Sequence, residues 1–390
     1  MRGGRARGII APLAVALAFG IVGTSGLLLT HAGTATQNKE AEDGAITGNA
    51  GQQADSTASG GKAVQFGVCT VSSKLVNSCR PWLGAASNGY VTPDFILSTA
   101  MANEESRIGR QLDIVHDYRN PGTVMSADDQ TLAKRTNTIL LMNWKPSLTW
   151  ADASGCGTSA CDTVDGQIDD MANSIKSLGS TKIMVALFHE PENDVTAGGA
   201  PNCSGGGSML KGTSGTTADY VNMWHNVRAR FDTDGVTNVV WVMNYMGYYT
   251  YDCMIGDLWP GNSYVDWIMW DSYANNSSDF DTMAGRFYNV LLADDDAAHD
   301  YDSKAWGLGE WGATKAAAQS TAYALYDNAK TALDSNTFPR LKAYVIWDSD
   351  ANGAEIRTSY DANGSFDQTE QDHYNAFADD PRFTDAFYQK

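Results

Sequence analysis

Short apolar runs alternate along this chain with segments whose apolar residues recur at the spacing of an amphipathic helix. One such helical face carries Ile168, Met171 and Ile175, and the helix is expected to end at Gly179. Largely apolar strands that alternate with amphipathic helices indicate a parallel sheet covered by helices. The apolar runs predict eight strands, at Val64–Val68, Gln111–Val115, Thr138–Asn143, Lys182–Phe188, Asn238–Asn244, Val265–Trp270, Lys304–Gly309 and Leu341–Trp347.

Eight such units favour an α/β fold of the (β/α)8 TIM-barrel type over an open, doubly wound sheet. The chain has 390 residues, which is enough for this barrel, since it typically needs roughly 250. The doubly wound sheet stays an alternative. It is weakened because no Gly-rich phosphate loop follows the first predicted strand.

The first 62 residues are expected to lie outside the folded domain. Three arginines precede the apolar stretch Ile9–Leu29, which is typical of a signal peptide at residues 1–35. An uncleaved membrane anchor is the alternative. Residues 36–62 are rich in small and polar residues and cannot bury enough surface to offset chain entropy. We therefore predict a disordered linker there and one folded domain at residues 63–390.

The six cysteines all follow the predicted leader. An even number of cysteines in an oxidising compartment indicates disulfides. We expect the pairs Cys69–Cys79, Cys156–Cys161 and Cys203–Cys253. A zinc site is the alternative, but the spacings are irregular and no C-x-x-C pair occurs.

The formal net charge is −19 at pH 7. A surface this acidic repels nucleic acid and anionic lipid, and it suits a neutral partner better than a polyanionic one. We therefore expect the protein to contact no nucleic acid, and no membrane apart from its leader. With the predicted leader, we expect a secreted, extracellular protein, and we expect it to be a monomer.

Carboxyl side chains follow several of the predicted strands at the point where each strand ends. Glu190 follows the fourth strand, Asp271 the sixth and Glu310 the seventh. In a TIM barrel the active site forms at these strand ends. Two carboxyls surrounded by Trp and Tyr match the needs of glycosidic cleavage, one as a protonated acid and one as an ionised nucleophile. Aromatic rings can then stack on the apolar faces of sugar rings.

Other hydrolase motifs do not fit the sequence. The pair His189-Glu190 lacks the second histidine of the H-E-x-x-H zinc motif, because Asn193 takes that place. A Ser-His-Asp hydrolase is not supported either, since no G-x-S-x-G elbow occurs. We expect neither a metal nor a cofactor.

Several short motifs accompany these carboxyls: Trp144-Lys145-Pro146, His189-Glu190, Trp259-Pro260-Gly261, Val265-Asp266-Trp267, Asp271-Ser272-Tyr273 and Glu310. In combination they resemble glycoside hydrolase family 26, whose members are retaining (β/α)8 hydrolases. The resemblance covers roughly the whole folded part of the chain. Each motif alone is weak, and the combination is specific.

The resemblance implies roles for these residues. Glu190 would act as general acid and then base, and Glu310 as the nucleophile that forms a glycosyl-enzyme. Tyr273 would orient Glu310. The remaining candidates for substrate binding are His189 in the cleaved subsite, Trp347 as a stacking floor, and Asp271, Trp311, Trp144 and Tyr245. For Trp311 and Trp144 packing in the core is an equal alternative, and for Tyr245 it is the favoured one.

A mechanism that retains the anomeric configuration predicts that the carboxyl groups of Glu190 and Glu310 lie about 5–5.5 Å apart. An enzyme that inverts it needs about 6.5–9.5 Å. Burial and the charge of the nucleophile should raise the pKa of the acid.

The resemblance favours β-1,4-mannan as the substrate, with β-1,3-xylan and mixed-linkage β-glucan as alternatives. The chain departs from many β-mannanases of the family at two places that flank the cleaved bond. It has Ala186 where they have Arg, and Pro191-Glu192-Asn193 where they have Met-Asn-Gly. A non-catalytic carbohydrate-binding barrel is the alternative function, and the presence of both glutamates argues against it.

Overall fold

The computed structural model describes residues 50–54, 57–66, 69–87, 96–199, 212–275, 277–314, 317–348 and 366–384. The chain divides between Phe66 and Gly67 into two compact units. In the first, β1 (Ala50–Ala54) pairs antiparallel with β2 (Lys62–Phe66). The predicted leader at residues 1–35 lies outside the described residues.

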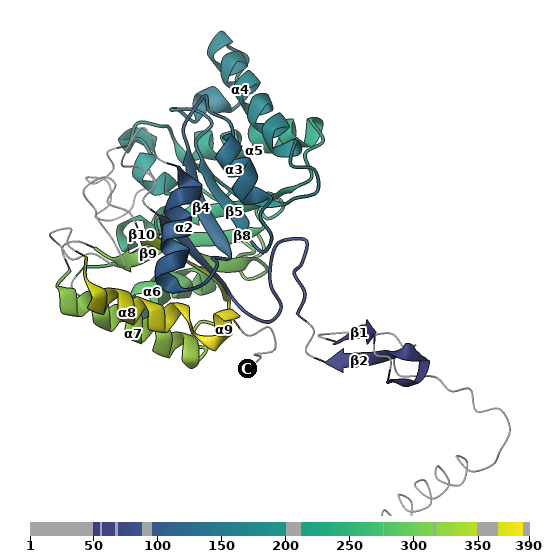
Figure 1. The fold of residues 1–390 in the computed structure, drawn as a ribbon. Helices are drawn as coiled ribbons and strands as arrows, with labels where there is room; N and C mark the ends of the chain where they lie inside the picture. The colour runs from purple at the N-terminus through teal and green to yellow at the C-terminus, as the bar shows by residue number, and fades with distance from the viewer. Residues whose placement is uncertain are drawn as a thin grey trace, which may run out of the picture. The chain divides into compact units, whose positions relative to one another are not determined.

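The second unit contains a closed barrel of eight parallel strands (Figure 1), in the order β10-β3-β4-β5-β6-β7-β8-β9. The predicted TIM barrel is therefore confirmed. Its strands are β3 (Trp82–Ser87), β4 (Ile114–Arg119), β5 (Ile139–Trp144), β6 (Ile183–Leu187), β7 (Val239–Tyr245), β8 (Trp267–Ala274), β9 (Ala305–Ala313) and β10 (Leu341–Asp348).

The first barrel strand was predicted wrongly. The run Val64–Val68 overlaps β2, which pairs with β1, and the barrel begins with β3 instead. The sequence of β3 is WLGAAS, and its small residues weaken the apolar signal. At Gly84 the neighbouring strand leaves no room for a side chain: a Cβ there would lie 2.7 Å from the Cβ of Ile114. The β1–β2 pair gives regular structure to the end of the segment 36–62, and the domain boundaries stay predictions.

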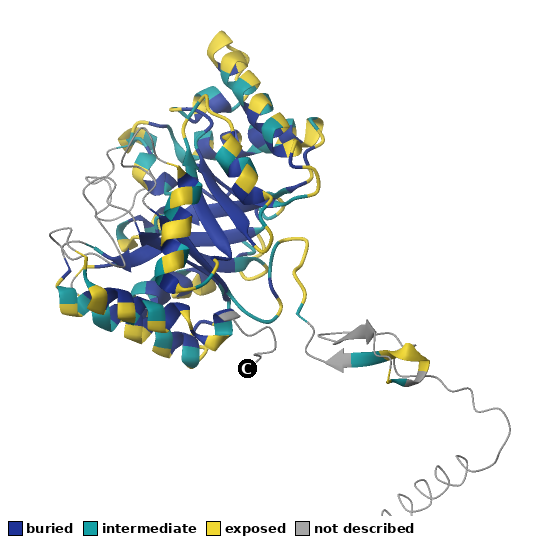
Figure 2. Ribbon diagram, viewed as in Figure 1, coloured by how far each residue is buried: buried dark blue, intermediate teal, exposed yellow. Residues whose placement is uncertain are grey.

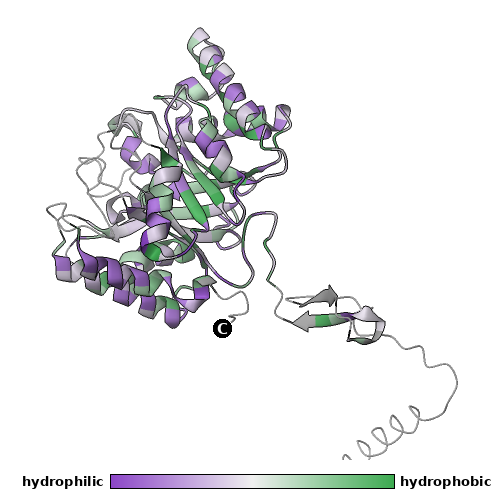
Figure 3. Cartoon of the chain, in the orientation of Figure 1, coloured by the Kyte–Doolittle hydropathy of each residue, from purple (hydrophilic) through white to green (hydrophobic). Residues whose placement is uncertain are grey.

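Helices cover the outside of the barrel, and their exposed faces are polar (Figures 2 and 3). Local sequence sets several helix starts. Ser126 and Asp129 form a capping box at one helix, and Thr216 and Asp219 form another. None of the helices among the described residues is long and apolar enough to cross a bilayer. The helices are α2 (Leu97–Ile108), α3 (Ala127–Ala133), α4 (Ser159–Lys176), α5 (Thr217–Thr233), α6 (Phe280–Ala293), α7 (Gln319–Asp334), α8 (Gln368–Ala378) and α9 (Pro381–Thr384).

Two of the expected disulfides, Cys69–Cys79 and Cys156–Cys161, are present. The third expected pair involves Cys203, which lies outside the described residues.

The barrel interior changes from apolar to polar along the strands. Leu141, Met184, Val242 and Met269 pack together inside the lower part. Side chains alternate between the two faces of a strand, so the next inward positions on β5, β7 and β8 are two residues further along. These positions are occupied by Asn143, Asn244 and Asp271, all buried. The polar residues lie at the carboxyl ends of the strands, and the candidate site lies at this end of the barrel.

Candidate active site

Glu310 points into the barrel because β9 contains a bulge. Asp271 of β8 pairs with Glu310, whereas the preceding Trp270 pairs with Leu308, so Gly309 is the extra residue. A bulge of this kind changes the face to which the following side chain points. Only glycine fits at this position, since a Cβ on Gly309 would lie 2.0 Å from Oδ1 of Asn244.

Two tyrosine hydroxyls donate hydrogen bonds to the Glu310 carboxylate. Tyr118, on β4, donates to Oε1 at 2.5 Å, and Tyr273, on β8, donates to Oε2. Burial raises the pKa of Glu310, and these two hydrogen bonds oppose that rise. With both oxygens bound, the carboxylate has a fixed orientation and is stabilised in its ionised form.

Glu190 lies directly after β6 in a left-handed backbone conformation. Its φ is 49°, and that of Phe188 is 55°, so two non-glycine residues next to the site adopt a costly conformation. The turn is held because the backbone N–H of Glu190 donates to the carbonyl of Asn244 at 2.9 Å. Burial, and then the charges of Glu310 and Glu192, raise the pKa of Glu190 to about 8.

Glu192, to which the sequence assigned no role in the site, anchors the loop that carries Glu190. Its side chain is buried, and both of its oxygens accept the backbone N–H of Met246 at 3.0 Å. Burial raises the pKa of Glu192 to about 7. The loop after β6 is thus tied to the loop after β7.

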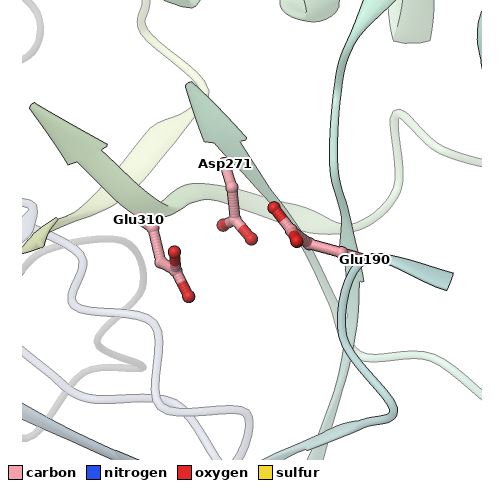
Figure 4. A group of neighbouring side chains, drawn as sticks. All are labelled: Glu190, Asp271 and Glu310. Carbon is pink, nitrogen blue, oxygen red and sulfur yellow. The ribbon is translucent and has the colours of Figure 1, made fainter. Parts of the chain in front are cut away.

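Asp271 lies between the two glutamates (Figure 4). One oxygen from each of Glu190, Asp271 and Glu310 lies within 4.8 Å of the others. Oδ2 of Asp271 accepts a hydrogen bond from Asn244 at 2.8 Å, and Oδ1 has no partner among the described residues. Burial, followed by the charge of Glu310, raises the pKa of Asp271 well above its usual range. We therefore expect Asp271 to be protonated beside an ionised Glu310.

His189 and Trp347 lie beside the carboxyls, around the ring of Tyr118. The centroid of the Tyr118 ring lies 5.4 Å from the centroid of the His189 ring and 5.4 Å from that of the Trp347 ring, and both contacts are edge-on. Burial lowers the pKa of His189 well below its usual value, so this imidazole is neutral. The structure thus brings together six of the predicted site residues: Glu190, Glu310, Asp271, His189, Tyr273 and Trp347.

Three other candidates are not part of this group. Trp311 packs against Phe280 and Phe377, on the helix side of the barrel wall. Trp144 packs against Phe231 of α5, and the Tyr245 hydroxyl donates to a backbone carbonyl at 3.0 Å. All three are almost fully buried in the main core. Their substrate-binding roles are corrected: they stabilise the fold.

Tyr118, His116 and Asn244 were missed. His116 and Tyr118 alternate along β4, and their side chains approach at 3.3 Å. The predicted strand stopped at Val115, although β4 continues to Arg119. Extending the two-residue alternation would have placed both side chains inside the barrel.

This geometry combines a carboxylate oriented by two tyrosines with a nearby glutamate that stays protonated near neutral pH. Such a pair can donate a proton to one atom while attacking its neighbour. Three close carboxyls could also hold a cation, as could the exposed group Asp295, Asp300 and Asp302.

Comparisons with known proteins show the family of the chain. A family model described as glycosyl hydrolase family 26 matches residues 102–301. Endoglucanase H from Acetivibrio thermocellus is 26% identical over 213 residues, which is 47% of this chain and 20% of that protein. The chain therefore spans about a fifth of the length of this relative.

Solved structures share the fold at low identity. A GH26 β-mannanase from Bacteroides ovatus matches with a TM-score of 0.54 and 13% identity, over 80% of this chain and 94% of that one. The GH26 domain of an endo-β-mannanase/endo-β-glucanase from Prevotella bryantii matches with a TM-score of 0.51 and 15% identity, over 78% of this chain and 90% of that one.

Proposed function

Because this chain belongs to glycosyl hydrolase family 26, we propose that it cleaves internal β-glycosidic bonds of a neutral polysaccharide with retention of configuration. The observation that carries the proposal is the approach of Glu190 and Glu310: one carboxyl oxygen of each lies within 4.8 Å of the other. A close approach of this kind supports a retaining pair, whose carboxyl groups lie about 5–5.5 Å apart, over the wider separation of about 6.5–9.5 Å in inverting enzymes.

In the first step, Glu310 attacks the anomeric carbon while Glu190 protonates the leaving oxygen. The bond from the anomeric carbon to that oxygen breaks, and a glycosyl ester on Glu310 forms. In the second step, Glu190 takes a proton from water, and the water oxygen displaces Glu310. Tyr118 and Tyr273 hold Glu310 for both steps, while His189 and Trp347 contact the sugar on the nucleophile side.

β-1,4-Mannan is the first candidate substrate, since the motifs resemble those of β-mannanases. A β-glucan is the second, because the curated relative is named an endoglucanase. The family is consistent with either, and Ala186 and Glu192 lie where the chain departs from the mannanase pattern. The net charge of −19 supports a neutral chain of either kind.

We also propose that the enzyme acts outside the cell. The two disulfides support this, since such bonds persist in oxidising compartments. The signal peptide at residues 1–35 and the catalytic domain at residues 63–390 are part of the same proposal.

The test is a panel of β-mannan, galactomannan, mixed-linkage β-glucan and β-1,3-xylan, with reducing ends measured over time. NMR of the first products on a cleaved oligosaccharide gives the anomer. We expect cleavage of one polymer and an initial β product. An initial α product would mean inversion, and no cleavage of any polymer would favour the non-catalytic binding barrel.

The pH profile of kcat/KM should depend on Glu192. Glu190 must be protonated to act, and its pKa is about 8, so activity should fall as the pH rises through about 8. Glu310 must be ionised, so activity should also fall at low pH. Glu192→Gln keeps an acceptor for Met246 and removes a charge that raises the pKa of Glu190. We expect the basic limb to move to lower pH.

The acidic limb provides the internal control, because Glu192 is not among the groups that shift the pKa of Glu310. A basic limb that stays in place in Glu192→Gln would show that this charge does not act on Glu190.

A further inference from the structure

Two exposed tyrosines lie on the loop that follows β7. Tyr248 is 40% exposed and Tyr249 is 63% exposed, and their ring centroids are 4.6 Å apart. Tyr251 lies beneath them, 5% exposed and 6.2 Å from the Tyr248 ring. Large aromatic side chains gathered on an exposed surface usually mark a contact with a ligand.

The loop is held in place at both ends. Its first residue, Met246, donates its N–H to Glu192. Arg286 of α6 donates to both oxygens of Asp252 at 2.9 and 2.8 Å, and to the carbonyl of Gly247. The backbone N–H of Tyr251 donates to the backbone carbonyl of Tyr248 at 2.9 Å. The tyrosines are therefore preorganised, which reduces the entropy lost on binding.

The loop lies on the Glu190 side of the site. Glu192 connects Met246 to the β6 loop, two residues after Glu190. Burial raises the pKa of Tyr251, and the charges of Glu192 and Glu190 add to that rise. The other aromatic group, Tyr118 with Trp347, adjoins Glu310. The β7 loop is therefore linked to the Glu190 side of the carboxyl pair, and Tyr118 with Trp347 to the Glu310 side.

We propose that Tyr248 and Tyr249 form a stacking platform for the leaving-group sugar units of the polysaccharide. This inference rests on the proposed function, in which Glu190 protonates the leaving oxygen. The leaving sugar must then extend from Glu190, and the tyrosine loop is an exposed aromatic surface that Glu192 and Met246 connect to the Glu190 loop. Ring faces stack on the apolar face of a neutral sugar, and the hydroxyls can bond its polar edge.

The test compares two substrates of the same sugar. One is the polymer that the wild type cleaves, and the other is an aryl oligosaccharide glycoside whose leaving group is a nitrophenol. For the Tyr248→Ala/Tyr249→Ala variant, we expect the loss of kcat/KM on the polymer to exceed the loss on the aryl glycoside by about ten-fold. Transglycosylation to an added oligosaccharide should fall by a similar factor, because the acceptor occupies the same surface.

Controls separate stacking from general damage. Tyr248→Phe/Tyr249→Phe should restore most polymer activity, since it keeps the ring faces. Leu292→Ala changes an apolar side chain of similar exposure, 43%, on α6, and should leave both activities unchanged. Equal losses on the two substrates, or no loss on the polymer, would overturn the platform while the hydrolase activity stands. A wild type inactive on both would overturn the proposed function and the platform with it.

Discussion

Glu310→Ala should reduce turnover of every substrate by about 10⁵-fold or more, which is the scale seen when a covalent nucleophile is removed. The loss should be as large for aryl glycosides as for the polymer, since a better leaving group cannot replace the attacking carboxylate. The measurement is kcat on both substrates. The protein should still fold, because the removed carboxyl is buried and its pKa is already raised by that burial.

Added azide sharpens this test. In Glu310→Ala the space left by the carboxylate can admit a small anion, which would attack the anomeric carbon once. The expected product from an activated β-glycoside is an α-glycosyl azide. Asp257→Ala is the matched control, since it removes an exposed carboxyl, and it should retain wild-type turnover. Residual activity of a few per cent in Glu310→Ala would mean that the nucleophile lies elsewhere.

The positions of the two glutamates could be predicted because of a general property of the barrel. Residues that follow an apolar run come together at one end of the barrel, however far apart they are in sequence. Glu190 and Glu310 both follow such runs, and the structure brings them together. What the sequence could not show is how Glu310 reaches the interior. That depends on the bulge at Gly309, and a lone glycine in a strand does not distinguish a bulge from a close contact.

Aromatic side chains were predicted less well than carboxyls. Trp311 follows Glu310 directly, so alternation along β9 turns it away from the site and into the core. Tyr118 was missed because the predicted strand ended at Val115, whereas β4 continues to Arg119. A carboxyl is costly to bury unless it is paired, so one at a strand end indicates a polar site, whereas a tryptophan there is equally suited to packing. Residue type is therefore stronger evidence for Glu190 than for Trp144.

The proposed stacking platform requires that the loop of the tyrosines keep its position relative to the loop of Glu190. The β6 and β7 loops are joined through Glu192 and Met246, so the loop of the proposed proton donor is bound to the loop of the proposed leaving-group surface. Preorganised groups of this kind contribute most when they are rigid before the substrate binds. A change at Glu192 should therefore affect both proton transfer and polymer binding, whereas a change at Tyr249 should affect only the latter.

Glu190→Ala should give a loss that depends on the leaving group. On the polymer we expect a fall of about 10²–10⁴-fold, the usual contribution of general acid catalysis. On a dinitrophenyl glycoside the first step needs no proton, so the glycosyl-enzyme should form rapidly and then accumulate, because no base activates water. A burst of dinitrophenol followed by slow turnover is the expected time course.

Azide should then restore turnover in Glu190→Ala, because an anion attacks the glycosyl-enzyme without a general base, and the product should be a β-glycosyl azide. The basic limb near pH 8 should disappear as well, since the group responsible for it is gone. Equal losses on the polymer and the dinitrophenyl glycoside, with the basic limb intact, would assign the proton to another group. The buried Asp271 would be the first candidate, because burial and the charge of Glu310 raise its pKa too. If Glu310→Ala gives the α-glycosyl azide and Glu190→Ala gives the β-glycosyl azide, the two glutamates act on opposite faces of the sugar, as double displacement requires.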